Sequence, residues 1–341
     1  MREYKCLHTN IFKENTFHIE PIRDEDKYAI LNIRNEQLYH LRQSEPLTAE
    51  KQEQYFATVV SALFETERPG QLLFSFFQDN QFVGYGGLVH INWVDKHAEI
   101  SFIMKTELEK EHFAGFWSNY LKLIEKVAFE ELKFHKIFTY AFDLRPHLYP
   151  VLLESGFREE ARLPEHCFFD GKYLDVLIHS KINTNVWFRK ALDTDVALYY
   201  TWANDPTVRS NSYSSETIPY ENHVKWFASK LKDENCFMVV FQNHDNVNIG
   251  QVRIQKTATA SAIIGISTDE KHRGKGYAAK MIAQASAAFL VKNPEICISA
   301  YIKLDNPASA KAFEKAGYQL KETVDYENVA SFHYIKSYEN R

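Results

Sequence analysis

Apolar and polar positions along the chain follow strand and helix periods in turn, and the same order occurs in both halves. In the second half, the β-branched segment SAIIGIST at 261–268 predicts a buried strand. The apolar positions from Ala278 to Phe289 recur at helical spacing and predict a helix with one buried face. A hairpin is expected at 236–256 and a strand at 296–302. The remaining expected elements are helices at 195–205, 219–231 and 308–317 and a last strand at 331–338.

The first half repeats this order. Its expected elements are helices at 27–41 and 48–64, a hairpin at 71–93, a strand at 97–104, a helix at 113–132, a strand at 136–142, a short helix at 146–156 and a strand at 171–182. Matching landmarks keep a near-constant offset, since Gly250 follows Gly84 by 166 residues and Gly317 follows Gly156 by 161. Two copies of one α+β (mixed α/β) domain are therefore predicted, at 1–182 and 187–341. Each would be a mixed, mostly antiparallel sheet flanked by helices.

Composition narrows the function classes. The 341 residues are 45% hydrophobic and 25% charged, with a net charge of −5, which gives no electrostatic case for broad binding to nucleic acid or an anionic membrane. The four cysteines are widely spaced, which is typical of reduced and mostly buried thiols. The N-terminus is too polar for a signal peptide, and no apolar segment approaches membrane-spanning length. We expect a cytoplasmic protein without a metal site.

One segment concentrates charge and glycine, DEKHRGKGYAAKMI at 269–282. Its glycines lie between the expected strand and helix, where free backbone amides and the helix dipole favour an anion. Lys271, His272, Arg273 and Lys275 add local positive charge. The alternative is a plain glycine turn with a solvated basic face. GKGYAA also satisfies a dinucleotide-binding pattern, but here about seven residues separate the strand from the first glycine. A Walker A loop is absent.

The same segment resembles a known family. RGKGYA (273–278) resembles the R/Q-x-x-G-x-G/A loop of the GCN5-related N-acetyltransferases (GNAT), and NPASAKAFEKAGY (306–318) resembles a second element of that family. The resemblance covers about 187–338 and implies acetyl-CoA as co-substrate. The residues that it implies for acetyl-CoA binding are Ile266, Ser267, Arg273, Gly274, Lys275, Gly276, Tyr277, Ala278, Ala279, Asn306 and Phe313.

A finer resemblance concerns the acceptor. WANDPTVRSNS (202–212), HVKWF (223–227) and IGQVRI (249–254) are similar to acetyltransferases that act on nucleotide-linked amino sugars, although ribosomal-protein-type acetyltransferases share parts of them. Trp202, Asn204, Arg209 and Trp226 would then form the acceptor side of the site, since aromatic rings with one arginine suit a sugar that carries a nucleotide phosphate. Alternatively, the tryptophans belong to the core and Arg209 to the surface.

The first half resembles the same fold without its loop. VGYGGLVHI, HAEISFI and the segment at 154–178 carry the likeness, but 105–118 places acidic residues where the arginine and glycines belong. Like charge there would repel a pyrophosphate. Arg145 also stands where the second half has Asn306. We predict that the first domain is degenerate and does not bind acetyl-CoA as its fold would.

The catalytic groups are less defined. Many family members carry a glutamate and a tyrosine where this chain has Ile263 and Phe313, whereas Glu99 stands at the first-half position that matches Ile263. The catalytic candidates are Tyr301, which could protonate the leaving thiolate, His223, which titrates near neutrality, and Glu99, which could complete a shared site. Tyr213 and Asp269 are weaker candidates. Each of these residues also has a purely structural alternative.

We therefore expect an N-acetyltransferase acting on a primary amine of a nucleotide-linked amino sugar, in a chain that forms a homo-oligomer. A protein N-terminus, a ribosomal-protein-type target or a small amine such as a polyamine is the alternative acceptor. A non-catalytic coenzyme A sensor or scaffold is the alternative of another class, because residues 263 and 313 do not titrate.

Overall fold

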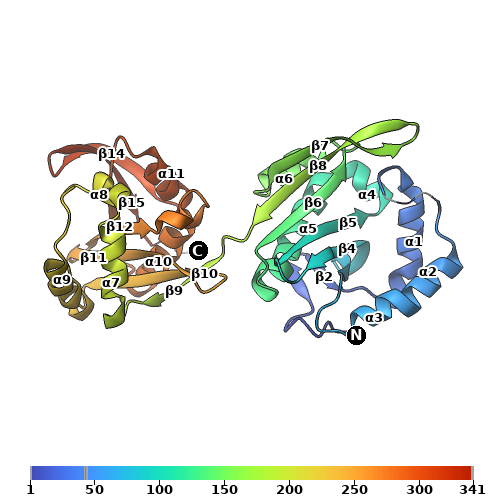
Figure 1. Cartoon of the computed structure of the whole chain (residues 1–341), viewed down its shortest axis with the longest axis horizontal. Helices are drawn as coiled ribbons and strands as arrows, with labels where there is room; N and C mark the ends of the chain where they lie inside the picture. The colour runs from blue at the N-terminus through green and yellow to red at the C-terminus, as the bar shows by residue number, and fades with distance from the viewer. Residues whose placement is uncertain (1, 42, 44, 339–341) are drawn as a thin grey trace. The chain divides into compact units, whose positions relative to one another are not determined.

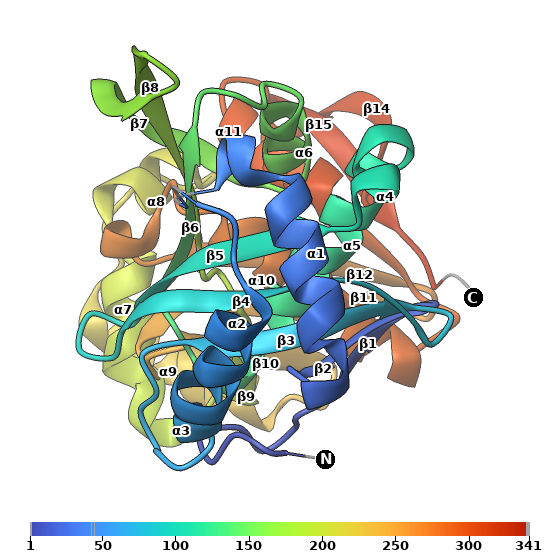
Figure 2. The same cartoon turned by 90° about the vertical axis from the view of Figure 1, so that its right-hand side faces the viewer.

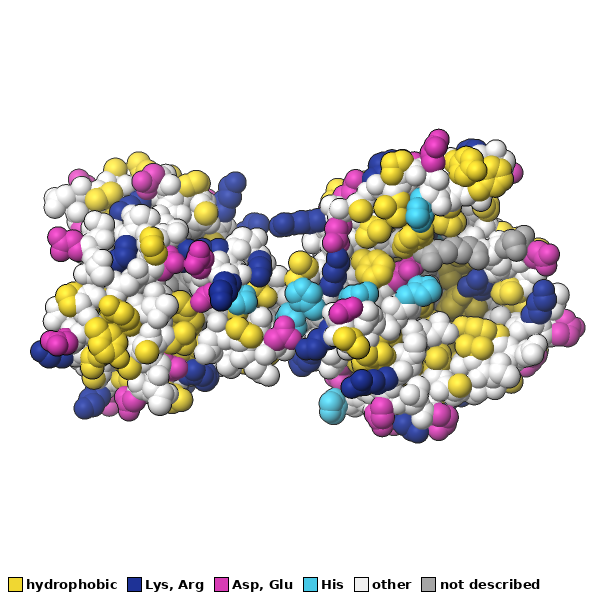
Figure 3. Space-filling model, viewed as in Figure 1, with side chains coloured by type: hydrophobic (Ala, Val, Ile, Leu, Met, Phe, Trp, Pro, Cys, Tyr) yellow, Lys and Arg dark blue, Asp and Glu magenta, His cyan; other side chains and the backbone are white. Residues whose placement is uncertain are grey.

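The computed structural model describes residues 2–41, 43 and 45–338. The chain divides into two compact units, Met1–Asn183 (the first unit) and Thr184–Arg341 (the second unit), as Figure 1 shows. No helix in the described part of the chain is both long and apolar enough to cross a membrane. On the face shown in Figure 3, basic and acidic side chains are interspersed over both units. All four cysteines are free and half-buried rather than mostly buried.

The first unit is built on one sheet of eight strands in the order β1-β2-β3-β4-β5-β6-β8-β7. Only β5 and β6 pair in parallel, and every other neighbouring pair is antiparallel. The strands are β1 (Phe12–Glu14), β2 (Phe17–Pro21), β3 (Leu72–Gln78), β4 (Gln81–Asn92), β5 (His97–Met104), β6 (Lys136–Phe142), β7 (Arg158–Phe169) and β8 (Lys172–Ile182).

Helices cover this sheet. They are α1 (Lys27–Glu36), α2 (Ala49–Tyr55), α3 (Ser61–Leu63), α4 (Thr106–Glu111), α5 (Phe113–Glu125) and α6 (Leu148–Glu154), with short helical turns η1 (Asp24–Asp26), η2 (Leu38–His40), η3 (Phe56–Val60) and η4 (Lys126–Glu131). Figure 2 shows α1 lying across β4 and β5. The buried side of α5 fills the core with large rings: Tyr120 stacks on Phe102 of β5, and Trp117 meets Phe102 edge to face.

The second unit repeats the plan with seven strands in the order β14-β15-β13-β12-β11-β10-β9. They are β9 (Val186–Lys190), β10 (Cys236–Asn243), β11 (Asn248–Ala258), β12 (Ser261–Thr268), β13 (Cys297–Lys303), β14 (Gln319–Tyr326) and β15 (Val329–Lys336). The helices are α7 (Val196–Ala203), α8 (Pro206–Asn211), α9 (Tyr220–Lys232), α10 (Tyr277–Lys292) and α11 (Pro307–Lys315), with turns η5 (Asp193–Asp195) and η6 (Glu270–His272). Again one central pair, β12 with β13, is parallel.

Strand register confirms that the two units are copies. Gly84 pairs with the last residue of β5, and Gly250 pairs with the last residue of β12. A Cβ at either glycine would lie within 2.4 Å of a carbonyl oxygen on the neighbouring strand, so both glycines allow the same close approach. Glu99 and Ile263 are each the third residue of the parallel pairing, which makes them structural counterparts.

The sequence pattern located the central strands but missed elements at the margins. β5, β6 and β12 run over the predicted residues. The edge strands β7 and β14, the strands β1, β2 and β9, and helix α8 were not predicted. The polar gap expected at 179–187 is shorter, because β8 continues to Ile182 and β9 begins at Val186. The acidic segment at 105–118 contains α4 and the start of α5.

Candidate functional site

The loop between β12 and α10 has a backbone that only glycine adopts easily. Asp269 begins the loop by accepting a hydrogen bond from the backbone amide of Lys271 at 3.0 Å. Gly274 and Gly276 then lie in the left-handed region, with φ of 73° and 84°. Glycine carries no Cβ penalty there, so the two glycines set the turn that leads into the helix.

The backbone amides at the two glycines of this loop have no acceptor among the described residues. Within the described residues, Gly274, Lys275 and Gly276 donate no backbone hydrogen bond, and the first-turn amides of a helix have no intrahelical acceptor. A Cβ built at either glycine would meet nothing within 4 Å, so the space above the loop is open. At the start of a 16-residue helix, these amides and the exposed Lys275 form a surface that suits an anion.

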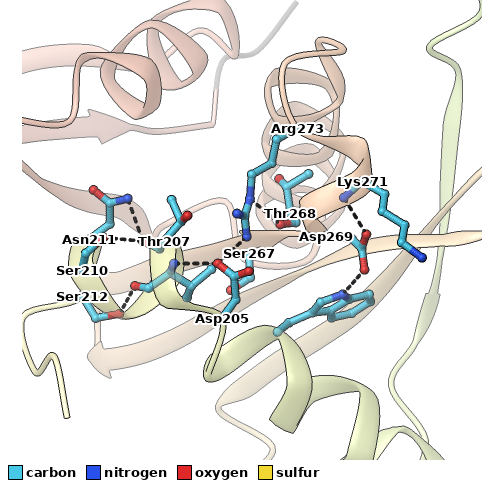
Figure 4. A network of polar contacts seen from close by, with 12 residues as sticks. Asp205, Thr207, Ser210, Asn211, Ser212, Ser267, Thr268, Asp269, Lys271 and Arg273 are labelled. Atoms are coloured by element: carbon cyan, nitrogen blue, oxygen red, sulfur yellow. Dashed lines mark hydrogen bonds and ion pairs between the residues drawn. The ribbon is translucent and has the colours of Figure 1, made fainter. Parts of the chain in front are cut away.

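Arg273 is engaged by the protein itself. Its Nη2 lies 2.6 Å from a carboxylate oxygen of Asp205, and its Nε donates to the carbonyl of Thr268 at 3.1 Å (Figure 4). Asp205 also accepts from the amide of Val208 and thereby caps α8. The guanidinium therefore attaches α8 to the loop, and its expected contact with a pyrophosphate stays a prediction.

A second link joins the loop to α7. The indole Nε1 of Trp202 donates to Asp269 at 3.0 Å, and the ring is buried beside Tyr199. Trp202 thus lies in the core, which was the alternative to a place on the acceptor side of the site. Asp269 supports both the loop and α7. Asn204 fastens the next segment by accepting from the amide of Ile218 and donating to the carbonyl of the same residue.

A cavity of about 440 Å³ lies in the second unit between the early helices and the sheet. It brings together five residues that the sequence analysis selected: Arg209, His223, Trp226, Ile266 and Ser267. Its lining contains two arginines and one histidine, and no aspartate or glutamate of the described residues belongs to it. Trp202, Asn204 and Tyr301 do not line it.

His223 lines this cavity, and one of its ring nitrogens is hydrogen-bonded to the protein. The ring is buried, and its Nε2 lies 3.1 Å from the carbonyl oxygen of Val196. Because a carbonyl only accepts, Nε2 carries the hydrogen and Nδ1 of the neutral ring is unprotonated. Burial lowers the pKa of His223, although the hydrogen bond to Val196 acts in the opposite direction. The ring is therefore neutral at pH 7, which is the form that a base requires.

Arg209 is committed to the loop that closes the cavity. Its Nη1 donates to the carbonyl oxygens of Ser214 and Glu216, and its Nη2 donates to the hydroxyl of Ser212. These bonds order the segment 212–218 after α8. The side chain lines the cavity, but its hydrogen bonds serve the fold rather than a bound molecule.

Sequence reasoning missed Arg253 and Gln251. Both lie on β11 and line the cavity, where the guanidinium of Arg253 lies 5.3 Å from the ring centre of Trp226. The side-chain amide of Gln251 donates to the hydroxyl of Ser267. The sequence pattern that could have identified them is the alternation of polar residues at 251, 253 and 255. These residues share one face of a strand inside the sheet, where apolar residues would be expected.

The other selected residues lie apart from the cavity. Tyr301 is stacked between Tyr326 and His333, with ring centres 3.9 and 4.6 Å away. Asn306 caps α11 by accepting from the amide of Ser309, and Phe313 is buried in the core. Their roles toward a ligand stay predictions. Tyr213 donates to the hydroxyl of Ser331.

In the first unit, α4 occupies the position of the glycine loop. Glu109 of α4 pairs with Arg145 at 3.2 Å, and the two side chains are only 8% and 13% exposed. Arg145 also lies over the ring of Trp117, and His40 packs against the pair with its Nε2 4.0 Å from Glu109. Glu99 lies on β5 with the Nε2 of His90 3.9 Å from its carboxylate, and its part in a shared site stays a prediction.

Two family models match the chain, and both are described as an acetyltransferase (GNAT) domain. One matches residues 19–178 and the other residues 185–319. Among curated proteins, the chain is 30% identical over 94 residues to the spermidine N(1)-acetyltransferase of Vibrio cholerae serotype O1. That match includes 28% of this chain and spans about half of the relative, 53% of its length.

Solved structures show a similar fold. The spermidine N-acetyltransferase from Vibrio cholerae in complex with CoA and spermine is 21% identical, with a TM-score of 0.44, over 50% of this chain and 98% of that one. An aminoglycoside acetyltransferase in complex with coenzyme A and kanamycin is 18% identical, with a TM-score of 0.40, over 45% and 95%. From the register of the two sheets and the two family models, the chain consists of two acetyltransferase (GNAT) domains in tandem.

Proposed function

We propose that the second unit binds acetyl-CoA and transfers its acetyl group to a primary amine. The observation that carries this proposal is the open glycine loop before α10, with unpartnered amides beneath empty space. A pyrophosphate group fits such a loop, since it accepts hydrogen bonds from several amides and its charge is favoured at a helix N-terminus. The backbone amides of residues 274–279 and the side chain of Lys275 would bind the pyrophosphate.

The residues of the cavity suit the transfer itself. Acetyl-CoA supplies the activated thioester, and the backbone of β12 at Ile266 and Ser267 would orient its carbonyl. In the transfer, the amine nitrogen forms a bond to the carbonyl carbon while the carbon–sulfur bond breaks. His223 Nδ1 takes the proton that the nitrogen loses, and the sulfur leaves as a thiolate that takes up a proton. The first unit lacks the loop and is proposed not to bind acetyl-CoA.

The acceptor is proposed to be an amine on a nucleotide-linked sugar. The support is the resemblance at 202–212 and 223–227 together with the indole face of Trp226, on which a sugar or base can pack. A polyamine is the second candidate, favoured by the 30% identity to a spermidine acetyltransferase. The absence of a carboxylate among the residues that line the cavity speaks against a polycation.

Calorimetry and thiol release test this function on the full chain. Acetyl-CoA should bind with one site per chain, and a UDP-linked amino sugar should release free thiol faster than spermidine does. His223→Gln should lower kcat while the affinity for acetyl-CoA is unchanged. If acetyl-CoA does not bind, the proposal is wrong. If acetyl-CoA binds but no amine in a broad panel is acetylated, the sensor or scaffold alternative replaces it.

Two expectations from the sequence stay predictions. Assembly into a homo-oligomer can be measured by light scattering of the purified chain, and location in the cytoplasm by fractionation of the source cells.

A further inference from the structure

Among the described residues, the guanidinium of Arg253 has no hydrogen-bond acceptor and no ion-pair partner. It lines the cavity and lies over the ring of Trp226, 5.3 Å from the ring centre. Arg209, the other arginine of the cavity, donates three hydrogen bonds to the segment 212–218. A guanidinium presents its N–H groups in one fixed plane, which suits bidentate binding of a carboxylate or phosphate.

Gly265 keeps the floor of the cavity open beside Arg253. The two residues are register partners on β11 and β12, inside the sheet. Gly265 does not have a positive φ, and a Cβ built there would meet nothing within 4 Å. Neither backbone conformation nor close packing therefore requires a glycine at this position. A glycine inside a strand weakens it, and one common reason for its presence is the close approach of a ligand.

Arg253 and His223 contact the same indole ring. The guanidinium lies 5.3 Å and the imidazole 5.5 Å from the ring centre of Trp226. A molecule that reaches both groups therefore lies beside the Trp226 ring. With an anion on Arg253 and an amine at His223, the molecule is an amino compound that carries its own negative charge.

We propose that Arg253 is the residue that selects the acceptor, by binding a phosphate or carboxylate group of the amine substrate. This inference rests on the proposed function of the second unit and narrows its substrate class to anionic amines. A polycation is disfavoured because its charge meets an arginine and no carboxylate in the cavity. The site belongs to the second unit alone, since the register counterpart of Arg253 in β4 is Gly87.

Matched pairs of amines test the proposal on the full chain. Glucosamine 6-phosphate and glucosaminuronic acid should be acetylated with a higher kcat/KM than glucosamine, and spermidine should be the poorest acceptor. Arg253→Gln should lower kcat/KM for the anionic amines by about 10- to 100-fold, mainly through KM, as expected for a lost charge-assisted hydrogen bond. The same variant should change glucosamine by less than about 2-fold and leave acetyl-CoA affinity unchanged.

The two anion sources separate within this experiment. A loss confined to the 6-phosphate assigns a phosphate, and a loss confined to the uronic acid assigns a carboxylate. Arg253→Lys, which retains the charge, should restore part of the activity and shows that the Gln variant is not merely misfolded. Gly265→Val, which places a side chain on the cavity floor, should weaken acceptor binding without lowering the unfolding temperature.

Direct binding keeps this test independent of catalysis. Even if no amine is acetylated, glucosamine 6-phosphate should bind the wild-type chain in calorimetry and lose that binding in Arg253→Gln. The inference is overturned if the wild type shows no preference between glucosamine and its anionic forms, or if Arg253→Gln impairs all three equally.

Discussion

The two units share the same sheet topology but differ in the segment that connects the central strand to the central helix. In the second unit, β12 leads into a glycine loop with open space above it. In the first unit, β5 leads into α4, whose Glu109 pairs with Arg145. Because both sheets retain the same register around this point, the segment after the central strand can change while the sheet is kept.

The largest effect on the difference between the units is expected from a negative charge at the N-cap of α10. Gly276→Asp places a side chain at φ 84° and a carboxylate where an anion would bind. We expect acetyl-CoA affinity to fall by at least about 100-fold, from backbone strain and charge repulsion together. Calorimetry with acetyl-CoA measures the change.

The matched control is His112→Asp, which introduces the same charge at the equivalent cap, before α5 of the first unit. It should leave acetyl-CoA binding unchanged. A loss in this variant would mean that the first unit also binds the ligand, and the contrast between the units would fail.

Removing the ion pair of the first unit is the next largest perturbation. Arg145→Ala leaves the nearly buried carboxylate of Glu109 without its cation, so unfolding free energy of this unit should fall by about 2–3 kcal/mol. Urea unfolding followed by tryptophan fluorescence measures it. Arg162→Ala, which removes a more exposed cation from Asp143 and Asp175, should cost less than about 1 kcal/mol. Equal losses of unfolding free energy in the two variants would show that burial does not make the Arg145–Glu109 pair more important than the exposed pair.

Acid should separate the units further. Burial, with the charge of Arg145 and His147, lowers the pKa of His40 to about 3, even though Glu109 is near, because that carboxylate is paired with Arg145. The unfolded chain takes up a proton near pH 6.5 and the folded chain does not. Stability from this group is therefore full above pH 6.5 and is lost as the pH falls below it, by about 1 kcal/mol between pH 7 and 5.5.

Unfolding of the His40→Gln variant at both pH values checks this linkage. The variant should show a shallower dependence on pH than the wild type. A wild-type slope in His40→Gln would contradict the assignment.

The smallest expected difference lies at a feature that both units share. Lys181 and Lys336, each on the last paired strand, donate to the final carbonyls of α6 and α11, at Ser155 and Ala316. Lys336→Met should cost about 0.5–1 kcal/mol. Lys181→Met also removes an ion pair with Glu125 and should likewise lower stability. Thermal unfolding of both variants measures these losses, and an unchanged unfolding temperature in either variant would contradict this interpretation of the caps.

Periodicity located the central elements of the fold. β12 was predicted from its apolar, β-branched residues and α10 from apolar positions at helical spacing, and the copy relation followed from the spacing of glycines. β7 and β14 were missed because edge strands expose most of their residues and carry charges. α8 was missed because it is six residues long and begins at a proline.

The sequence predicted the glycine motif of the candidate site but not the side-chain contacts around it. The sequence indicates an anion-binding loop, since glycine and basic residues before a helix have a direct physical meaning. It could not indicate that Arg273 is held by Asp205 or that Arg209 orders a loop, because these contacts depend on the packing of α8. Arg253 joins the cavity only through strand register, which a single sequence does not specify.

The two side-chain links at the loop have a thermodynamic consequence. Asp205 and Asp269 tie the glycine loop to α8 and α7, and α8 also contributes to the wall of the acceptor cavity. Any strain or rigidity that a ligand imposes on the loop is therefore shared with that wall. By reciprocity, any change that an occupant of the loop makes in the affinity of the cavity is matched by an equal change in the reverse direction.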